Sequence, residues 1–401
     1  MFKNIGRIAT DMYLLFQHHT TTEILRNVST DHDIFTITGT GWHFVKFLGP
    51  AVAVVGPDCR SERSQARVMA GPTYQGLFPK VATLPPSVQH VLWMISVPVV
   101  YPRLEAVESL ANTVAVGKKA VNTTYNILGK VTSSVAGVVG GKEVVAQGFS
   151  QVKKAVGKTG LMGNVLNQFG ELDIQEMLKD MWTHETKDLE RTYLIRTLQS
   201  IAQQKGIRMT FLSGGKLHNH VLSRNPVVVD PIANCRGADV NASGAGLVHD
   251  PTHPGDHKTM YQIISSPIVS APQSGYVLKM LHNQKTLYVP QNGKRSTHDV
   301  SDTKEDMMEI FHTDASGATR ELKKLMGRRG YAAFVAYDQD AMNAQNQTPF
   351  SPNPSISSHQ TQQQGLSKLS LAVDFVVQGD GAYNSTTKYG PVIVPHLEFG
   401  R

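Results

Sequence analysis

Apolar positions along the chain follow two periods, and the change between them separates strands from helices. Two short β-branched runs, at 51–55 and 91–97, end in turn residues and predict buried strands. Apolar residues three and four positions apart predict helices near 173–181 and over 187–205, and the next run, 207–212, predicts another strand. Single buried strands that alternate with helices are typical of an α/β layered fold.

The two ends of the chain are patterned as well. Residues 5–26 have the apolar spacing of a short helix, and 34–45 reads as an extended segment that Gly39 and Gly41 break. Later in the chain, 260–264 predicts a strand, and 369–377 and 389–394 alternate well enough to form a terminal pair of strands. We therefore expect an antiparallel β addition at the C-terminal end of the α/β fold.

Two segments break these patterns and suggest the domain organisation. At about 117–160 the sequence is rich in glycine and valine and carries seven lysines against one acidic residue, Glu143, which predicts a basic insertion. Residues 348–365 lack apolar periodicity and predict a polar linker or loop. We expect a main domain over 1–347 and, over 366–401, a strand pair that packs on it.

Composition and charge narrow the class of protein. A chain of 401 residues that is 40% hydrophobic can bury a sizeable core. The net charge of +7 favours phosphates, nucleic acid or anionic lipid wherever that charge gathers. Two cysteines, Cys59 and Cys235, make no disulfide framework and no zinc spacing, which favours an intracellular location, cytoplasmic or alternatively mitochondrial. The longest apolar run, 91–101, is shorter than the ~20 residues of a membrane span.

Several short strings occur in one order along nearly the whole chain. The main ones are at 15–21, 41–44, 56–63, 97–105 and 210–214. Together they resemble the PhoD-like phosphatases, in particular the fungal branch of that family. The resemblance implies a calcineurin-like metallophosphoesterase fold, in which helices flank a β-sandwich and two metal ions lie at the strand ends. Two such ions would clamp a phosphate and activate a water molecule for in-line displacement.

The metal site that the resemblance implies is altered in this sequence. The position of a metal-binding Asp is Gly215, and the position of a His is Leu217; neither side chain can bind a metal. His218 and His220 are weak candidate ligands close by. On the preceding helix Met181 stands where the family has a His, and methionine does not bind hard cations.

The first strands of the family and their ligands precede the part that this chain matches. We therefore expect an N-terminally truncated, degenerate metallophosphatase that needs no cofactor, or divalent metal ions if the site is retained. A fold without its opening strands leaves a sheet edge unpaired, which predicts a protein partner or self-association at that edge.

Polar residues do persist near the predicted strand ends. Asp58, Arg60, Arg63, Tyr101 and Arg103 could form a residual phosphate-contacting patch, since arginine forks suit phosphate oxygens. The alternative is structural, with Asp58, Arg60 and Arg63 forming an ion-pair network that caps the strand.

Histidines outside those strings have two interpretations. We expect His18, His19 and His43 to be hydrogen-bonded structural residues, because no Cys, Asp or second spaced His accompanies them. The cluster of His and Asp over 249–257 lies in a Gly- and Pro-rich loop and could bind a transition metal adventitiously.

Three functions remain open from the sequence. The first is a PhoD-like protein that has lost catalysis and acts as a binding or structural protein, with an anionic phosphate as one ligand it could take. The second is an active metal-dependent phosphatase or phosphodiesterase that another chain or a missing N-terminal segment completes. The third is a protein that binds a membrane surface or RNA through the basic insertion. The sequence contains no nucleophile triad, Walker loop or nicotinamide fingerprint.

Overall fold

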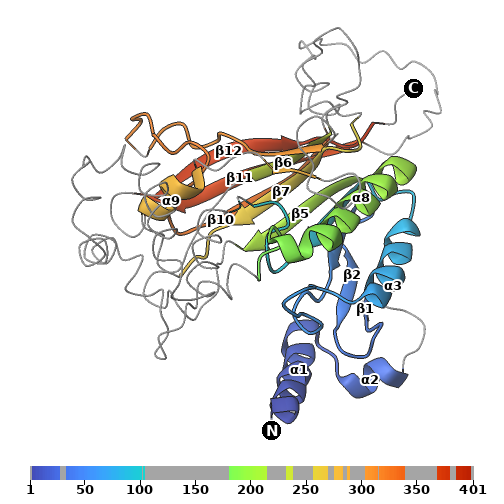
Figure 1. Ribbon diagram of the computed structural model, residues 1–401. Coiled ribbons are helices and arrows are strands. Elements are labelled where there is room, and N and C mark those ends of the chain that lie inside the picture. Colours follow the sequence, from blue (N-terminus) through green and yellow to red (C-terminus); the bar gives the residue numbers. More distant parts are fainter. Residues whose placement is uncertain are drawn as a thin grey trace, which may run out of the picture.

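The described part of the chain forms two β-sheets and several helices (Figure 1). The computed structural model describes residues 2–27, 33–101, 103, 180–214, 232–237, 256–269, 275–282, 287–289, 303–314, 316–338, 368–379 and 385–398. The predicted insertion at 117–160 and the predicted linker at 348–365 therefore lie outside the described residues.

The larger sheet is mixed and has nine described strands in the order β1-β2-β3-β4-β5-β7-β6-β9-β8. The strands are β1 (Ile34–Phe35), β2 (His43–Phe47), β3 (Val52–Gly56), β4 (His90–Met94), β5 (Arg208–Gly214), β6 (Ile232–Gly237), β7 (Met260–Ser265), β8 (Leu287–Tyr288) and β9 (Thr303–Met307). Neighbours among β3, β4, β5 and β7 run parallel, and the outer pairs run antiparallel. The central strands are almost wholly apolar because both faces of the sheet are covered.

The described helices are α1 (Phe2–His18), α2 (Thr22–Asn27), α3 (Gly71–Ala82), the 3₁₀ turn η2 (Glu185–Lys187), α8 (Asp188–Lys205) and α9 (Gly275–His282). Of these, α3 and α8 cover one face of the large sheet. Leu77 of α3 and Leu198 of α8 belong to one buried cluster with Val55, Trp93 and Phe211 of the sheet. α8 carries acidic residues in its first turn and ends at Gly206, whose φ of 66° closes the helix in the left-handed conformation.

A second, antiparallel sheet covers the other face. It consists of β10 (Gly330–Asp338), β11 (Leu369–Gln378) and β12 (Thr386–Val394) in that order. Val373 and Phe375 of β11 lie in one apolar cluster with Val54, Leu92 and Tyr261 of the large sheet. The layers are therefore helices, mixed sheet and antiparallel sheet, which is an α/β fold with a β-sandwich.

Most of the predicted elements are present with small shifts of their ends. The runs at 51–55, 91–97, 207–212 and 260–264 are β3, β4, β5 and β7, and the helix predicted over 187–205 is α8. The terminal strands at 369–377 and 389–394 are β11 and β12.

The extended segment 34–45 is two strands separated by a turn that contains Gly39, whose φ is 77°, as the glycines in it indicate. Two predictions need correction. The single helix over 5–26 is two helices, because the chain turns at His19, which has a φ of 55°. The C-terminal β addition has three strands, not two, since β10 pairs with β11 along its whole length. Of the helix near 173–181, only the last residues are described, and they form a turn.

Among the helices that the structure describes, none combines the length and the apolar character that crossing a bilayer requires.

Candidate functional site

A cavity of about 750 Å³ opens where the parallel strands of the large sheet end. Its wall includes Gly56, Met94, Gly214 and Ser265, at the ends of β3, β4, β5 and β7. The carboxyl ends of parallel strands are where open α/β sheets bind ligands. The volume also lies within the range of about 300–1,000 Å³ that small-molecule sites occupy. This cavity is therefore the candidate functional site.

Other elements complete the wall with mainly apolar groups. Residues from α1, from the start of β2 and from β10 also line it: Ala9, Tyr13, Trp42, Phe44, Ala332 and Phe334. The polar side chains of the wall carry hydroxyl groups, one thiol, one carboxylate and one guanidinium, from Thr10, Tyr13, Ser61, Ser96, Ser213, Ser265, Cys59, Asp58 and Arg60. The cavity thus combines an apolar enclosure with hydroxyl groups and a single described carboxylate.

Asp58 directly follows β3 and accepts four hydrogen bonds from the protein. Its Oδ1 accepts from the backbone N–H groups of Arg60 and Ser61, both at 2.9 Å. Its Oδ2 accepts from the Ser61 hydroxyl at 2.6 Å and from the Trp42 backbone N–H at 3.2 Å. Burial raises the pKa of Asp58, but these hydrogen bonds lower it more, so the pKa lies below its ordinary value. Since a carboxylate offers about four lone pairs, the protein itself occupies them all.

His43 is buried in β2 and is bound to the same turn. Its Nδ1 lies 3.0 Å from the Asp58 backbone N–H and accepts a hydrogen bond from it. The proton of the neutral ring is therefore on Nε2. Burial lowers the pKa of His43, although Asp58 and Glu62 oppose this, and the ring stays neutral. Binding a metal through Nε2 would move the proton to Nδ1, against the Asp58 N–H, so His43 has the structural role predicted from the sequence.

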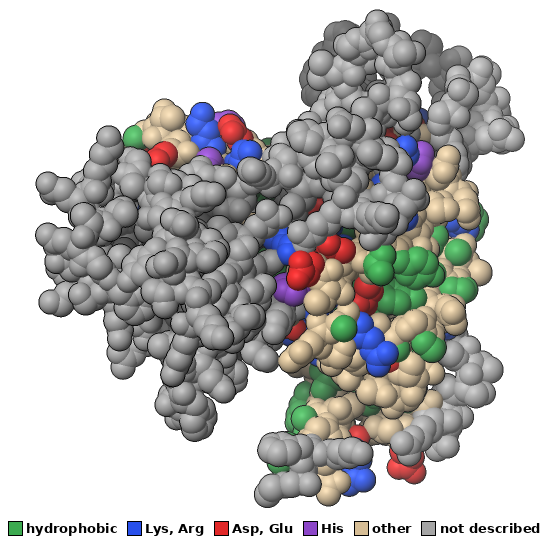
Figure 2. All heavy atoms as spheres, in the orientation of Figure 1, with side chains coloured by type: hydrophobic (Ala, Val, Ile, Leu, Met, Phe, Trp, Pro, Cys, Tyr) green, Lys and Arg blue, Asp and Glu red, His purple; other side chains and the backbone are tan. Residues whose placement is uncertain are grey.

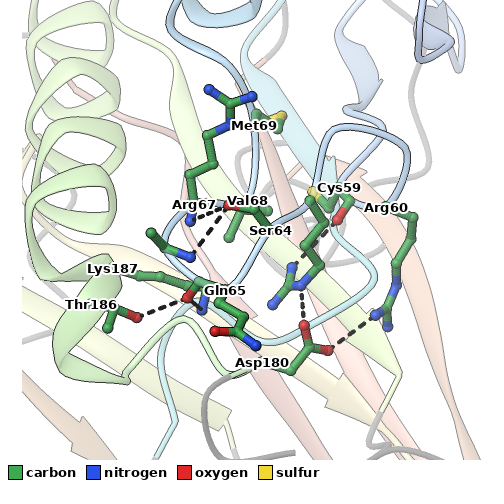
Figure 3. A network of polar contacts seen from close by, with 12 residues as sticks. Cys59, Arg60, Ser64, Gln65, Arg67, Val68, Met69, Asp180, Thr186 and Lys187 are labelled. Carbon is green, nitrogen blue, oxygen red and sulfur yellow. Dashed lines mark hydrogen bonds and ion pairs between the residues drawn. The ribbon is translucent and has the colours of Figure 1, made fainter. Parts of the chain in front are cut away.

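Two arginines of the loop after β3 converge on Asp180 (Figure 3). Arg63 Nε donates to Asp180 Oδ1, and Arg60 Nη1 donates to Asp180 Oδ2 at 3.2 Å. Arg63 Nη1 also donates to the Cys59 carbonyl oxygen at 3.3 Å. An ion-pair network therefore exists here, but the acceptor that both arginines share is Asp180 rather than the predicted Asp58.

The same loop is fastened to the start of α8 through a backbone carbonyl (Figure 3). Lys187 Nζ and Thr186 Oγ1 donate to the Gln65 carbonyl oxygen at 3.2 Å and 3.1 Å. Burial of Lys187 and the charge of the nearby Arg63 lower the pKa of Lys187 to about 8, while Asp180 and Glu190 raise it. These contacts fix the position of the loop relative to the helix layer.

Two carboxylates, the buried Glu62 and the half-buried Glu190, hold the end of the loop where α3 begins. Glu190 of α8 accepts from the backbone N–H groups of Val68 and Met69, each at 2.8 Å. Glu62 accepts from the Ala70 N–H at 2.8 Å and thereby caps α3, whose N-cap residue Ala70 has no capping side chain. The cavity wall at Asp58 is consequently part of a rigid, multiply bonded loop.

Comparison with known proteins identifies the family. The sequence model of the PhoD related phosphatases matches residues 1–234 and 232–401. The chain belongs to the PhoD related phosphatase family. It is also 24% identical over 364 residues to uncharacterized protein YGR266W of Saccharomyces cerevisiae, which covers 86% of this chain. The chain spans 45% of the length of that yeast relative. No solved structure matches the chain.

Phosphatases related to PhoD are typically metal-dependent, and a bound metal ion needs several ligand side chains with free lone pairs. Among the residues that the structure describes, no group of three His, Cys, Asp or Glu side chains could hold a metal ion. The described wall carries one carboxylate, Asp58, whose lone pairs are already used, and His43, which is bonded to the Asp58 backbone behind the wall, has the wrong tautomer. The described residues of this PhoD-related chain therefore do not fit a dinuclear metal site.

The altered ligand positions fall mostly outside the described residues. Gly215, Leu217, His218 and His220 belong to the segment 215–231, which is outside them. Met181 is described and buried, next to the fully buried Trp182. The side chain of Met181 is thus packed in the interior, and its place as a lost histidine ligand stays a prediction.

Only part of the predicted phosphate patch reaches the cavity. Asp58 and Arg60 line it, whereas Tyr101 and Arg103 are buried away from the wall that the structure describes. Burial raises the pKa of Tyr101 above its ordinary value. Arg103 Nη2 lies 3.7 Å from a carboxylate oxygen of Glu185. The patch as a whole remains a prediction.

The other predicted histidines are only partly described. His18 Nε2 lies 2.7 Å from the Tyr13 hydroxyl, which supports a structural role. Of the cluster over 249–257, only Asp256 and His257 are described, and Asp256 accepts from the Lys258 backbone N–H at 2.9 Å and the Thr259 hydroxyl at 2.7 Å. This carboxylate stabilises its own turn.

Sequence reasoning missed the serines of the cavity. Ser96, Ser213 and Ser265 each lie at or just after the end of a parallel strand. Their position relative to the predicted strands was the available signal, since strand ends form the site in such sheets. The contribution of α1 and β10 to the wall had no signal in the sequence, because only the tertiary fold brings them to the strand ends.

Proposed function

We propose that this PhoD-related chain acts as a binding protein that holds a ligand in the strand-end cavity and does not hydrolyse phosphate esters there. The observation that carries the proposal is the state of Asp58, whose four hydrogen bonds leave no lone pair for a metal ion. A carboxylate engaged in this way stabilises a turn and supplies no ligand for the metal-bound water that the family's chemistry needs.

The proposed ligand has an apolar body and an anionic group. Trp42, Phe44 and Phe334 would contact the apolar body, and the serine hydroxyls would accept or donate hydrogen bonds. Arg60 lines the wall, and its guanidinium, which also donates to Asp180, is of the type that suits a phosphate or carboxylate. The net charge of +7 favours an anion over a cation.

We also propose that the fold is a variant of the calcineurin-like metallophosphoesterase architecture. In support of this, two sheets pack face to face, helices flank the mixed sheet, and the cavity is at the ends of parallel strands. The alternative of an active phosphatase completed by another segment or chain is kept as the competing prediction, because more than half of the yeast relative has no counterpart in this chain.

A single probe tests both parts of the proposal. 4-Nitrophenyl phosphate has an aromatic body and a phosphate, and its hydrolysis releases a coloured product. We expect calorimetry to detect its binding and absorbance to detect no turnover above background with Mn²⁺, Fe²⁺, Zn²⁺ or Ca²⁺. Metal-stimulated turnover by the purified chain would contradict the loss of catalysis and favour the alternative.

A cavity-filling variant connects the binding to the cavity. A side chain at Gly214 would meet no heavy atom within 4 Å at its Cβ position, so Gly214→Leu projects into open space in the wall. We expect the affinity for 4-nitrophenyl phosphate to fall about tenfold or more, since a leucine takes up volume that the ligand needs. Gly71→Ala is the matched control, because that glycine also has free space but lies at the start of α3. Equal affinities of the two variants would show that the cavity is not the binding site.

A further inference from the structure

A second cavity lies at the end of the antiparallel sheet where β11 ends and β12 begins, and we call it the β12 pocket. It encloses about 310 Å³, at the lower end of the range that small-molecule sites occupy. α9 and the loop between β9 and β10 also line it. That loop, orange in Figure 1, reaches the surface at the upper left, where basic and acidic side chains lie next to one another in Figure 2. The described linings of the β12 pocket and the strand-end cavity have no residue in common.

Positive charge exceeds negative charge in this lining. Three basic side chains and two carboxylates belong to it: Lys279, Arg320, Arg328, Asp314 and Glu321. Glu321 forms an ion pair with Lys279 at 2.8 Å. Asp314 accepts three hydrogen bonds on Oδ1, from the N–H and hydroxyl of Ser316 and from the Ala318 N–H, and so stabilises its own turn. The two arginines therefore carry the excess positive charge of the pocket.

Arg320 is held in place by neutral groups. Its Nη2 donates to the Leu325 carbonyl oxygen at 3.1 Å, and its Nη1 contacts the sulfur of Met326. Its guanidinium carbon lies 5.8 Å from the centre of the Phe311 ring, which is a cation–π contact. These partners position the half-buried guanidinium but carry no charge that would neutralise it. A charge that is partly withdrawn from water in this way favours a counter-ion.

The second arginine is close enough to act on the first. Arg328 Nη1 donates to the Gln378 carbonyl oxygen at 3.2 Å, which places it at the end of β11. Burial lowers the pKa of Arg320, Tyr389 opposes this, and the charge of Arg328 lowers the pKa further. Both guanidiniums remain charged at neutral pH. An anion that contacts both would therefore relieve their mutual repulsion.

The donors of the β12 pocket match a phosphate group better than a carboxylate. Arginine forks bind phosphate oxygens in a bidentate manner, and a phosphate monoester carries about two negative charges at neutral pH, one for each guanidinium. A carboxylate carries one. The hydroxyls of Thr319 and Thr387 also line the pocket and can donate to further phosphate oxygens.

We propose that the β12 pocket binds a small phosphate-bearing anion, with Arg320 and Arg328 as its charged contacts. Lys279 joins them when the anion displaces the carboxylate of Glu321. The site is separate from the strand-end cavity, and the inference does not depend on the ligand proposed there.

Calorimetry of the full chain with inorganic phosphate at constant ionic strength tests the proposal. Arg320→Gln keeps an N–H donor for the Leu325 carbonyl but removes the charge, and it should lower the affinity about tenfold or more. Arg67→Gln is the matched control, because it makes the same change at an exposed arginine outside the pocket, and it should change the affinity less than about twofold. Gly214→Leu, which fills the strand-end cavity, should also leave phosphate binding unchanged.

A gain of affinity keeps the test valid if Arg320→Gln folds poorly. Glu321 is exposed, and Glu321→Gln removes a negative charge from the pocket and releases Lys279, so it should raise the affinity about threefold or more. Acetate should bind at least about tenfold more weakly than phosphate. Glycerol phosphate that binds more tightly than inorganic phosphate would identify an organic phosphate as the ligand, and equal affinities would identify free phosphate.

Four results would overturn the proposal. They are no heat of phosphate binding, equal affinities of Arg320→Gln and Arg67→Gln, no gain in Glu321→Gln, or acetate binding as tight as phosphate binding. A loss in Gly214→Leu without a loss in Arg320→Gln would also overturn it and assign the phosphate to the strand-end cavity.

Discussion

Asp58 and His43 join the end of β3 to the start of β2 through backbone groups. The N–H of Asp58 donates to the His43 ring, and the Asp58 carboxylate accepts from the N–H of Trp42. Both side chains are of types that bind metals, but Asp58, which lines the cavity, is saturated with hydrogen bonds, and His43, which is buried behind it, is fixed by the Asp58 N–H. At the scale of the residue, therefore, the hydrogen-bond partners decide the chemistry, and residue type does not.

His90 makes the stability of the fold depend on pH. It is buried at the start of β4, and its Nε2 donates to the Leu369 carbonyl oxygen at 2.7 Å. Burial lowers its pKa to about 4, although the bond to Leu369 opposes this, while the ordinary value is 6.5. Between pH 6.5 and about 4 the unfolded chain binds a proton that the folded chain does not. We expect the free energy of unfolding to have its full value above pH 6.5 and to fall by about 3 kcal/mol as the pH drops to about 4.

The measurement is urea unfolding at a series of pH values. His90→Gln keeps an N–H donor for the Leu369 carbonyl but cannot titrate, so its curve should be flatter over this range. Protonation of other groups, such as Asp58 and Glu62, also destabilises the fold in acid. The difference between the curves of the original protein and of His90→Gln therefore isolates the contribution of His90. Parallel curves for the two proteins would mean that His90 is already protonated in the fold.

At the scale of the element, the loop between β3 and α3 is held by carboxylates from both of its sides. Glu62 comes from the loop itself and Glu190 from α8, and together they accept from three consecutive backbone N–H groups, at Val68, Met69 and Ala70. The loop is thus bound to the helix layer along its second half.

Glu190→Gln should loosen this loop. The amide nitrogen of glutamine donates, so one of the Val68 and Met69 N–H groups would lose its acceptor, and we expect about 2 kcal/mol less stability. Hydrogen exchange over 57–70 should speed up more than exchange in β11. Gln203→Ala, at an exposed position of the same helix, serves as the control and should change stability by less than about 0.5 kcal/mol. Equal exchange rates in both variants would contradict the role of Glu190.

The periodic elements could be predicted from the sequence, and the irregular ones could not. The strands β3, β4 and β5 have clear apolar patterns because both of their faces are buried. The helix α8 has a clear apolar period because one of its faces is buried. The helix α3 was not predicted, because Gly71 at its start and Pro79 within it are residues that usually interrupt a helix.

The candidate site was predictable only as a location. Strand ends at Gly56 and Ser213 follow from the sequence, and the cavity lies there. Which atoms are free at that location depends on contacts such as the one between Trp42 and Asp58, 16 positions apart. Local sequence holds no information about that bond, because it depends on the pairing of β2 with β3.

At the scale of the whole molecule, polar contacts join the two sheets at the amino ends of β4 and β5. Arg208 is buried at the start of β5, and its Nε donates to the Pro395 carbonyl oxygen at 3.1 Å. Its Nη1 donates to the carbonyl oxygens of Asp256 and Thr259 at 2.7 Å and 2.9 Å. One guanidinium thus connects three segments that are distant in sequence.

Arg208→Met should weaken the attachment of the second sheet. It leaves three buried carbonyl groups without this donor, and we expect the free energy of unfolding to fall by about 3 kcal/mol. Arg208→Lys keeps the charge but not the planar fork, so its loss should be intermediate. Urea unfolding gives the values, and hydrogen exchange in β11 and β12 should rise in the same order. A methionine variant as stable as the original protein would show that the apolar contacts alone hold the sheets.

The position of these contacts bears on how the cavity could respond to a ligand. Arg208 and His90 join the sheets at one end of the parallel strands, and the cavity lies at the other end, where Phe334 of β10 faces the large sheet across it. Between the two ends the sheets meet through apolar side chains, whose attraction has no preferred direction. A ligand in the cavity therefore meets a wall that apolar contacts hold together, while the described hydrogen bonds between the sheets lie at the far end of the strands.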